Sequence, residues 1–447
     1  MARNRRNTIR ISIAFLSAWS GFMLILYFLR GVTWFHLGDF RFRTAMAYHG
    51  ILIPAWLMLA LAYSRIIDHS RFIGNLLGTG AVSAGILTGI GSVLINNRGV
   101  SLGTGIQVTG MILAEITVLG IIIGSFWHHF KTPQNGIDTT AWWTVSIGLV
   151  GLSLATPLGH LAGAAKDLGE KLPILVRHAA LLGLSPKAVV DGYVGSHSHQ
   201  VLAAFLAAGF ALPLIGRAPG KPSAVKLMEK IGLVVVAGAT IAQLALYQYC
   251  AFSGWEPPDL FSNGPNGLPL DDFILIVLGL GMLLLLPSLL ATGKEIISAE
   301  DHSRYTNRIV TLILLAYMIS VVFLGLYIEF HEQYFGHGVG NAAGVPNDLA
   351  YIRAHLLFGF MVIPILMGTL LNGSLLTSRK QICFSTVFAI IVIIAGIAGT
   401  FLWTFFLNDT VIKITIFLTI VFLFVYSLQL IISTGYISHR KNILERE

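Results

Sequence analysis

Long apolar runs dominate this chain and restrict it to a membrane fold. About twelve stretches reach the ~20 residues that a helix needs to cross a bilayer. They are expected at 10–32, 44–66, 72–95, 104–127, 140–164, 194–216, 229–252, 272–292, 308–330, 350–373, 382–407 and 411–434. Charged residues make up only 11% of the chain, whereas soluble domains carry about 25%. The sequence therefore predicts an all-α, polytopic membrane protein.

The basic residues are unevenly distributed between alternate loops. The chain has 29 Lys and Arg against 21 Asp and Glu, a net charge of +8. Most of the Lys and Arg fall on the side of the basic start, MARNRRNTIR, which the positive-inside rule assigns to the cytoplasm. This distribution predicts a multi-pass protein with both termini in the cytoplasm. It also accounts for the positive charge without a nucleic-acid partner.

Three of the expected spans share a pattern. The segments AMAYHGILIPAWLMLALAYSR, VGSHSHQVLAAFLAAGFALPLIGR and YIRAHLLFGFMVIPILMGTLL each have a histidine near the outer end and a proline farther in. The histidines His49, His199 and His355 are roughly 150 residues apart, which matches one in every fourth helix. We therefore expect one integral membrane domain over 1–447, built from three pseudo-repeated four-helix units at about 1–135, 136–305 and 306–447.

The segment GYVGSHSHQVLAAF places His197 and His199 two residues apart. An α-helix turns about 100° per residue, so positions i and i+2 point to nearly opposite sides of the helix. Two such imidazoles do not readily share one ion, because a shared ion prefers ligands at i and i+4. Each can instead bind a separate flat cofactor. Haem iron accepts axial imidazole, and a helical bundle accommodates its apolar ring.

Other roles for these histidines remain open at this point. A histidine inside a membrane is often a hydrogen-bonding group between helices. Imidazole is also a ligand for copper and zinc, so a transition-metal site is a second alternative. Structural hydrogen bonding is the favoured interpretation for His160 and His178, with contact to a cofactor carboxylate or a quinol as the alternative. Glu115, an acid inside a span, is a functional candidate by default.

These short motifs resemble the haem–copper oxidase superfamily, whose large subunits include oxidase and nitric oxide reductase catalytic chains. That fold has twelve helices in three pseudo-equivalent groups of four. Its second helix carries a haem-ligating histidine followed by glycine, as in AYHG at His49. Its tenth helix carries a His-x-His pair, which DGYVGSHSHQVL resembles. Here the pair lies in the span 194–216, and the span 229–252 lacks the histidines of a copper site. Copper is therefore not expected.

The resemblance implies a ligand set for two b-type haems. His49, His197, His199 and His355 are the expected axial ligands. One possible pairing is His199 with His355 and His197 with His49. The other is His49 with His199 and His197 with His355. Arg353, two residues before His355, is the expected partner of a haem propionate because its guanidinium suits a carboxylate.

The resemblance implies electron transfer between membrane quinol and an outer-face redox partner. The chain is then expected to be a b-type cytochrome subunit of a respiratory complex in a prokaryotic inner membrane, beside a periplasmic cytochrome or metalloprotein. Iron with two histidines has no open coordination position, which favours electron transfer over catalysis. One alternative is a divergent haem reductase of nitric oxide or oxygen. Another is a cofactor-free transporter, since repeated helices are common in that class.

Overall fold

The computed structural model is all-helical in the part of the chain that it describes. The described residues are 2–29, 43–66, 71–96, 100–131, 137–168, 173–215, 221–253, 270–291, 311–324, 327, 354, 357–376, 378–406 and 408–444. Within these ranges there is no β-strand, so the predicted all-α fold class is confirmed.

The long helices follow the apolar runs of the sequence. They are α1 (Ala2–Leu29), α2 (Arg43–Ile66), α3 (Arg71–Asn96), α4 (Val100–Lys131), α5 (Thr139–Leu168), α7 (Pro186–Ala211), α8 (Ser223–Ser253), α9 (Leu270–Ala291), α14 (Arg379–Phe406) and α15 (Thr410–Leu444). Shorter elements are α6 (Pro173–Leu182), η3 (Leu212–Leu214), η4 (Met318–Phe323), η5 (Phe358–Val362), α13 (Ile363–Leu370) and η6 (Gly373–Leu375).

Eight described helices are long and apolar enough to cross a membrane. These are α1, α3, α4, α5, α8, α9, α14 and α15, and the bent pair formed by α6 and α7 raises the number to nine. A multi-pass membrane protein is thus supported. The full set of twelve spans and the three four-helix repeats stay predictions, because the expected spans 308–330 and 350–373 are described only in part.

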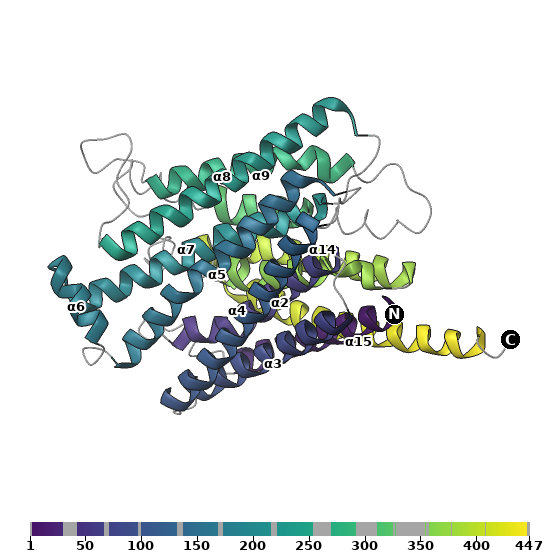
Figure 1. The fold of residues 1–447 in the computed structure, drawn as a ribbon, viewed down its shortest axis with the longest axis horizontal. Helices are drawn as coiled ribbons and strands as arrows, with labels where there is room; N and C mark the ends of the chain where they lie inside the picture. Colours follow the sequence, from purple (N-terminus) through teal and green to yellow (C-terminus); the bar gives the residue numbers. More distant parts are fainter. Residues whose placement is uncertain are drawn as a thin grey trace.

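The helices form one elongated bundle (Figure 1). α8 and α9 pack together along one edge, and α3 and α15 lie toward the opposite edge. α5 packs against both α7 and α8, and α2 packs against α3 and α13. The beginning of α1 and the end of α15 lie at the same end of the bundle (Figure 1), as an even number of spans requires.

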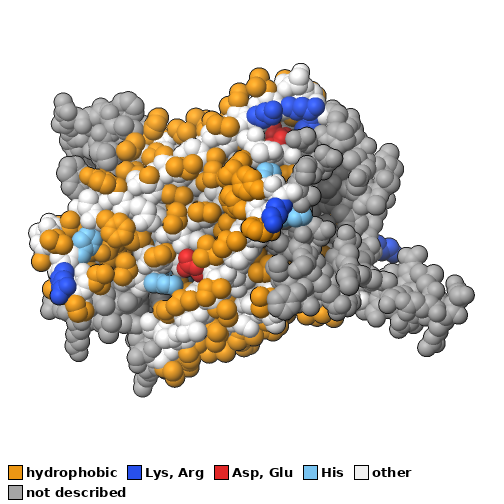
Figure 2. All heavy atoms as spheres, in the orientation of Figure 1, with side chains coloured by type: hydrophobic (Ala, Val, Ile, Leu, Met, Phe, Trp, Pro, Cys, Tyr) orange, Lys and Arg blue, Asp and Glu red, His pale blue; other side chains and the backbone are white. Residues whose placement is uncertain are grey.

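The visible flank of the bundle is covered by apolar side chains (Figure 2). On α4, Ile116, Ile123 and Trp127 are more than 60% exposed. Large exposed apolar areas are rare on soluble monomers and mark a surface that meets lipid or another protein. The surface therefore agrees with a bundle surrounded by hydrocarbon.

α7 begins eight residues before the apolar run that predicted it. Ser185 caps its start, because the Ser185 side chain accepts a hydrogen bond of 3.2 Å from the Ala188 amide, and Pro186 occupies the first turn. Hydropathy did not locate this start, since Lys187 and Asp191 interrupt the apolar residues in the first turns of α7. As a result His197 and His199 lie well inside a continuous helix. The short helix α6 precedes this start.

Small residues bring α5 and α7 into close contact. A Cβ atom on Gly148 would lie 2.6 Å from the Ala204 carbonyl oxygen, and one on Gly151 would lie 3.0 Å from Ala204 Cβ. Glycine and alanine let membrane helices approach this closely. The α5 backbone therefore reaches the face of α7 that carries His197.

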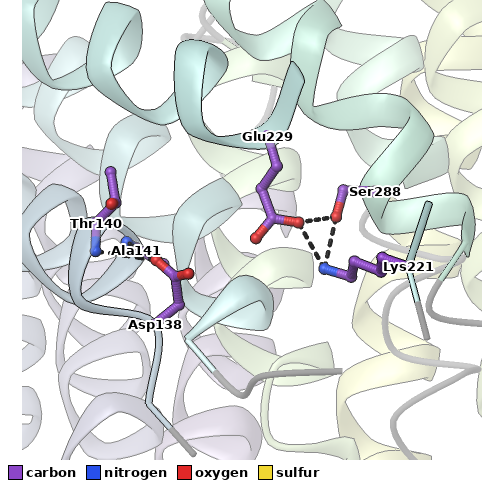
Figure 3. Close-up of polar contacts among 6 residues, drawn as sticks. All are labelled: Asp138, Thr140, Ala141, Lys221, Glu229 and Ser288. Atoms are coloured by element: carbon purple, nitrogen blue, oxygen red, sulfur yellow. Dashed lines mark hydrogen bonds and ion pairs between the residues drawn. The ribbon is translucent and has the colours of Figure 1, made fainter. Parts of the chain in front are cut away.

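Polar contacts fix one end of the bundle (Figure 3). Lys221 Nζ lies 2.5 Å from Glu229 Oε2 and donates a 2.6 Å hydrogen bond to Ser288 Oγ. Ser288 Oγ also donates to Glu229 Oε2, so both buried charges have partners. Close by, Asp138 Oδ1 accepts hydrogen bonds of 2.9 and 3.0 Å from the amides of Thr140 and Ala141 and caps α5.

Candidate functional site: a histidine-lined cavity in the bundle

A cavity opens between α2, α5, α7 and the π-helical turn η5. The space between these elements, counted with its opening to solvent, is about 680 Å³. Most of the wall is aliphatic or aromatic, with Ile53, Leu152 and Phe205 among the lining residues. Among the described residues of the lining, the ionisable side chains are His49 and His197. The cavity is therefore suited to a largely apolar ligand that is gripped at one level by imidazole.

His197 is oriented by α5. Its Nδ1 lies 2.8 Å from the Ala155 carbonyl oxygen and must donate to it, since a carbonyl only accepts. In the neutral ring this tautomer leaves the lone pair on Nε2. Gly159 gives the ring its space, because a Cβ there would lie 2.7 Å from His197 Cε1. A ring nitrogen bound to a backbone carbonyl is the usual arrangement of a metal-ligating histidine.

His49 of α2 faces His197 across the cavity. The two ring centroids are 5.9 Å apart and the ring planes differ by 19°. Two imidazoles on opposite sides of one metal ion have ring centres about 6 Å apart, because each nitrogen lies about 2 Å from the metal and about 1 Å from its own ring centre. The observed separation of the two ring centres is close to this distance.

Trp56 adds a polar group that has no partner. Its indole Nε1 is buried and makes no hydrogen bond within the described part of the chain, although Trp56 lines the cavity. Tryptophan N–H groups usually find an acceptor when they are buried. These features suit an apolar ligand that also offers a hydrogen-bond acceptor.

His199 leaves α7 on a different side and enters a different environment. Its ring stacks on Tyr247 of α8 with centroids 4.8 Å apart and planes 12° apart. Its Nδ1 donates a 2.9 Å hydrogen bond to the Gly195 carbonyl, so the lone pair is again on Nε2. The Tyr247 hydroxyl donates to Asp271 Oδ2. The i, i+2 spacing thus sends the two imidazoles toward different neighbouring helices.

The other predicted ligands fall outside the described residues. His355 and Arg353 are not described, although Gly359, Ile363 and Pro364 of the same expected span line the cavity. Within the described ranges, no three His, Cys, Asp or Glu side chains gather as a metal centre. The described geometry therefore presents a two-imidazole site rather than a centre with three protein ligands.

The remaining histidines have smaller roles in the geometry. His178 Nδ1 is hydrogen-bonded to the Tyr193 hydroxyl, and Nε2 lies 2.8 Å from the Phe252 carbonyl, so this side chain joins α6 to α7 and α8. His160 Nε2 is buried and has no hydrogen-bond partner among the described atoms. Glu115 is half-buried on α4.

Sequence reasoning did not single out Trp56, Ala155 or Gly159. An aromatic, an alanine and a glycine in apolar helices carry no chemical signature of their own. Their roles arise only because α5 packs against α7 and α2 closes the cavity. No family model, no curated protein and no solved structure matches this sequence.

Proposed function

We propose that this protein is a membrane b-type cytochrome subunit, with two haems, that transfers electrons between membrane quinol and a redox partner on the outer face. The observation that carries the proposal is the facing pair His49 and His197, 5.9 Å apart in an apolar cavity. Three features support it. The two imidazoles can act as ligands to one metal, His197 Nδ1 is held by a backbone carbonyl, and the Trp56 indole N–H is left without an acceptor.

Within this proposal the chain's residues hold and insulate the cofactor. His49 and His197 would hold one iron, and His199 and His355 would then hold the other. The apolar lining excludes water and so favours the binding of a hydrophobic ring. The Ala155 carbonyl keeps His197 in the tautomer that presents Nε2. When bound, each haem supplies an iron that accepts and releases one electron.

The proposed setting follows from the cofactor. Iron with two histidines has no open position for a substrate, so electrons enter and leave through other molecules. Quinol is the membrane-soluble donor or acceptor in this proposal. A periplasmic cytochrome or metalloprotein is the outer-face partner, within a respiratory complex of a prokaryotic inner membrane. Copper has no role in this proposal.

An absorption spectrum of the purified protein, expressed with ample haem supply, tests the proposal. We expect sharp reduced b-type bands and about two haems per chain, as four axial histidines imply. Adding carbon monoxide to the reduced protein should leave the spectrum nearly unchanged. A large carbon monoxide shift would instead favour the reductase of nitric oxide or oxygen. A colourless protein would exclude both and leave the transporter.

A further inference from the structure

Five rings pack together where α4 ends and α5 begins. The His129 imidazole stacks on the Trp142 indole, with ring centroids 4.0 Å apart and planes 9° apart. The Phe126 ring meets Trp143 edge-on, with centroids 5.5 Å apart, so these contacts cross from one helix to the other. We call this group the aromatic shelf, and its members are Phe126, His129, Phe130, Trp142 and Trp143.

The aromatic shelf is open to the surroundings of the bundle. Phe130 is 70% exposed and Trp143 is 42% exposed, whereas Trp142 behind them is fully buried. Beside the shelf on α4, Trp127 is 66% exposed. Exposed tryptophans gather at the level of lipid headgroups, because the indole joins an apolar ring to a polar N–H. Ile123, one turn closer to the middle of α4, is equally exposed, so an apolar chain can lie along α4 from the shelf into the membrane.

Lys131 brings a positive charge to the edge of the shelf. Its Nζ lies 3.8 Å from the centroid of the Trp127 ring, which is a cation–π contact. Side chains on a helix point back toward its N-terminus, so the ammonium lies beside the exposed rings instead of extending past the helix end into water. In the described part of the chain no carboxylate forms an ion pair with this ammonium. The structure therefore leaves the charge available to an anion from outside.

The surroundings of Lys131 are positively charged. Asp138 is the described acid at the start of α5, and its Oδ1 is already engaged in capping the first turn of that helix. Lys226 and Lys230, at the start of α8, are exposed at the same end of the bundle. Figure 2 shows basic and histidine side chains close together where the apolar flank ends. The positive-inside rule assigns this end to the cytoplasm, where the membrane surface is negatively charged.

We propose that the aromatic shelf and Lys131 bind one anionic phospholipid. The lipid phosphate pairs with the Lys131 ammonium, the glycerol region lies on the exposed rings, and an acyl chain follows α4 past Ile123. A zwitterionic lipid fits less well, because its own cation cancels the charge that attracts the headgroup to lysine. The site therefore prefers phosphatidylglycerol over phosphatidylcholine. This inference goes beyond the proposed electron transfer and requires no haem.

Native mass spectrometry of the full chain tests the proposal by titration with phosphatidylglycerol or phosphatidylcholine of identical acyl chains. We expect the first phosphatidylglycerol to bind roughly fivefold more tightly, which is the contribution of one lysine near a membrane surface. Lys131→Gln should abolish this preference. Lys230→Gln is the matched control, since it removes an exposed lysine from the same end and should keep the preference. No preference in the wild-type chain, or equal losses in the two variants, would overturn the proposal.

A second variant separates the position of the charge from its presence. Trp127→Leu keeps an apolar surface and the Lys131 charge but removes the ring that holds the ammonium. We expect the affinity for phosphatidylglycerol to fall while that for phosphatidylcholine changes little. A full preference in this variant would contradict the proposed geometry. Inorganic phosphate should not displace the lipid, and displacement would show that the site takes free phosphate instead. Because Trp127 is exposed, circular dichroism should show an unchanged fold.

Discussion

The two sides of α7 place the same side chain in two different environments. On one side, His197 borders an apolar cavity, takes its orientation from the Ala155 carbonyl and faces another imidazole. On the other side, His199 stacks on Tyr247, whose hydroxyl donates to Asp271. A His-x-His pair therefore fixes only the directions in which its two imidazoles point. The neighbouring helices decide what each imidazole can do.

Removing the imidazoles one at a time is the strongest way to break this comparison. His197→Ala should lower the haem content from about two per chain to about one, because iron loses an axial ligand in the cavity. His199→Ala should remove the other haem, and the double variant should remove both. The measurement is haem per protein by absorbance. His178→Ala, whose partners are protein groups, is the control and should keep both haems.

The outcome of these variants also tests the pairing. If His49→Ala and His197→Ala lose the same haem, the two residues share one iron. If His49→Ala and His199→Ala lose the same haem, the exchanged pairing is correct, and the facing rings in the structure do not mark the ligand pair. Spectra of the reduced protein at low temperature separate the two haems when their bands differ.

Much of this architecture could be predicted from residues alone, for a simple physical reason. Backbone polar groups are costly to bury in hydrocarbon unless they are hydrogen-bonded, so a long apolar run almost always forms a membrane-spanning helix. The opposite directions of His197 and His199 follow from helical rotation. Trp56 and Gly159 could not be predicted, because their roles depend on which helices touch. Hydropathy also misplaced the start of α7, since Lys187 and Asp191 interrupt the apolar residues that follow the Ser185 cap.

A substitution at Gly159 should weaken haem binding only at the site that contains His197. Gly159→Ala puts a methyl group 2.7 Å from His197 Cε1, so the ring must move away from its position. Changes that disturb the orientation of a ligating histidine typically cost 10–100-fold in affinity. We expect haem titration to show weaker binding by about that factor at one site and no change at the other. Gly105→Ala, where a Cβ meets no neighbour within 4 Å, is the matched control. Equal weakening by both variants would show that the α5 contact does not position His197.

A third variant separates stability from cofactor binding. Lys221→Met leaves the Glu229 carboxylate buried without its cation, which should cost about 3–5 kcal/mol of unfolding free energy. The double variant Lys221→Met/Glu229→Leu should recover most of this loss because no buried charge remains. Denaturant unfolding in lipid measures both values. Haem content of the folded fraction should stay at the wild-type level, since this cluster contacts neither side of α7. If the double variant is no more stable than the single one, the ion pair is not what holds this end together.

The smallest expected effect is on the reduction potential of the haem that His199 is proposed to bind. Asp271 holds the hydroxyl of the tyrosine that stacks on His199, and its negative charge favours the oxidised, more positive iron. Asp271→Asn removes the charge and keeps a hydrogen-bond acceptor, so the potential should rise by up to about 59 mV, a tenfold change in the equilibrium constant for one electron. A redox titration of both haems checks this, and the haem in the cavity should not move. Tyr247→Phe keeps the stacked ring and loses only the hydroxyl, so its shift should be smaller. An equal rise at both haems would show that Asp271 acts through the whole bundle, and the two sides of α7 would then not be electrostatically distinct.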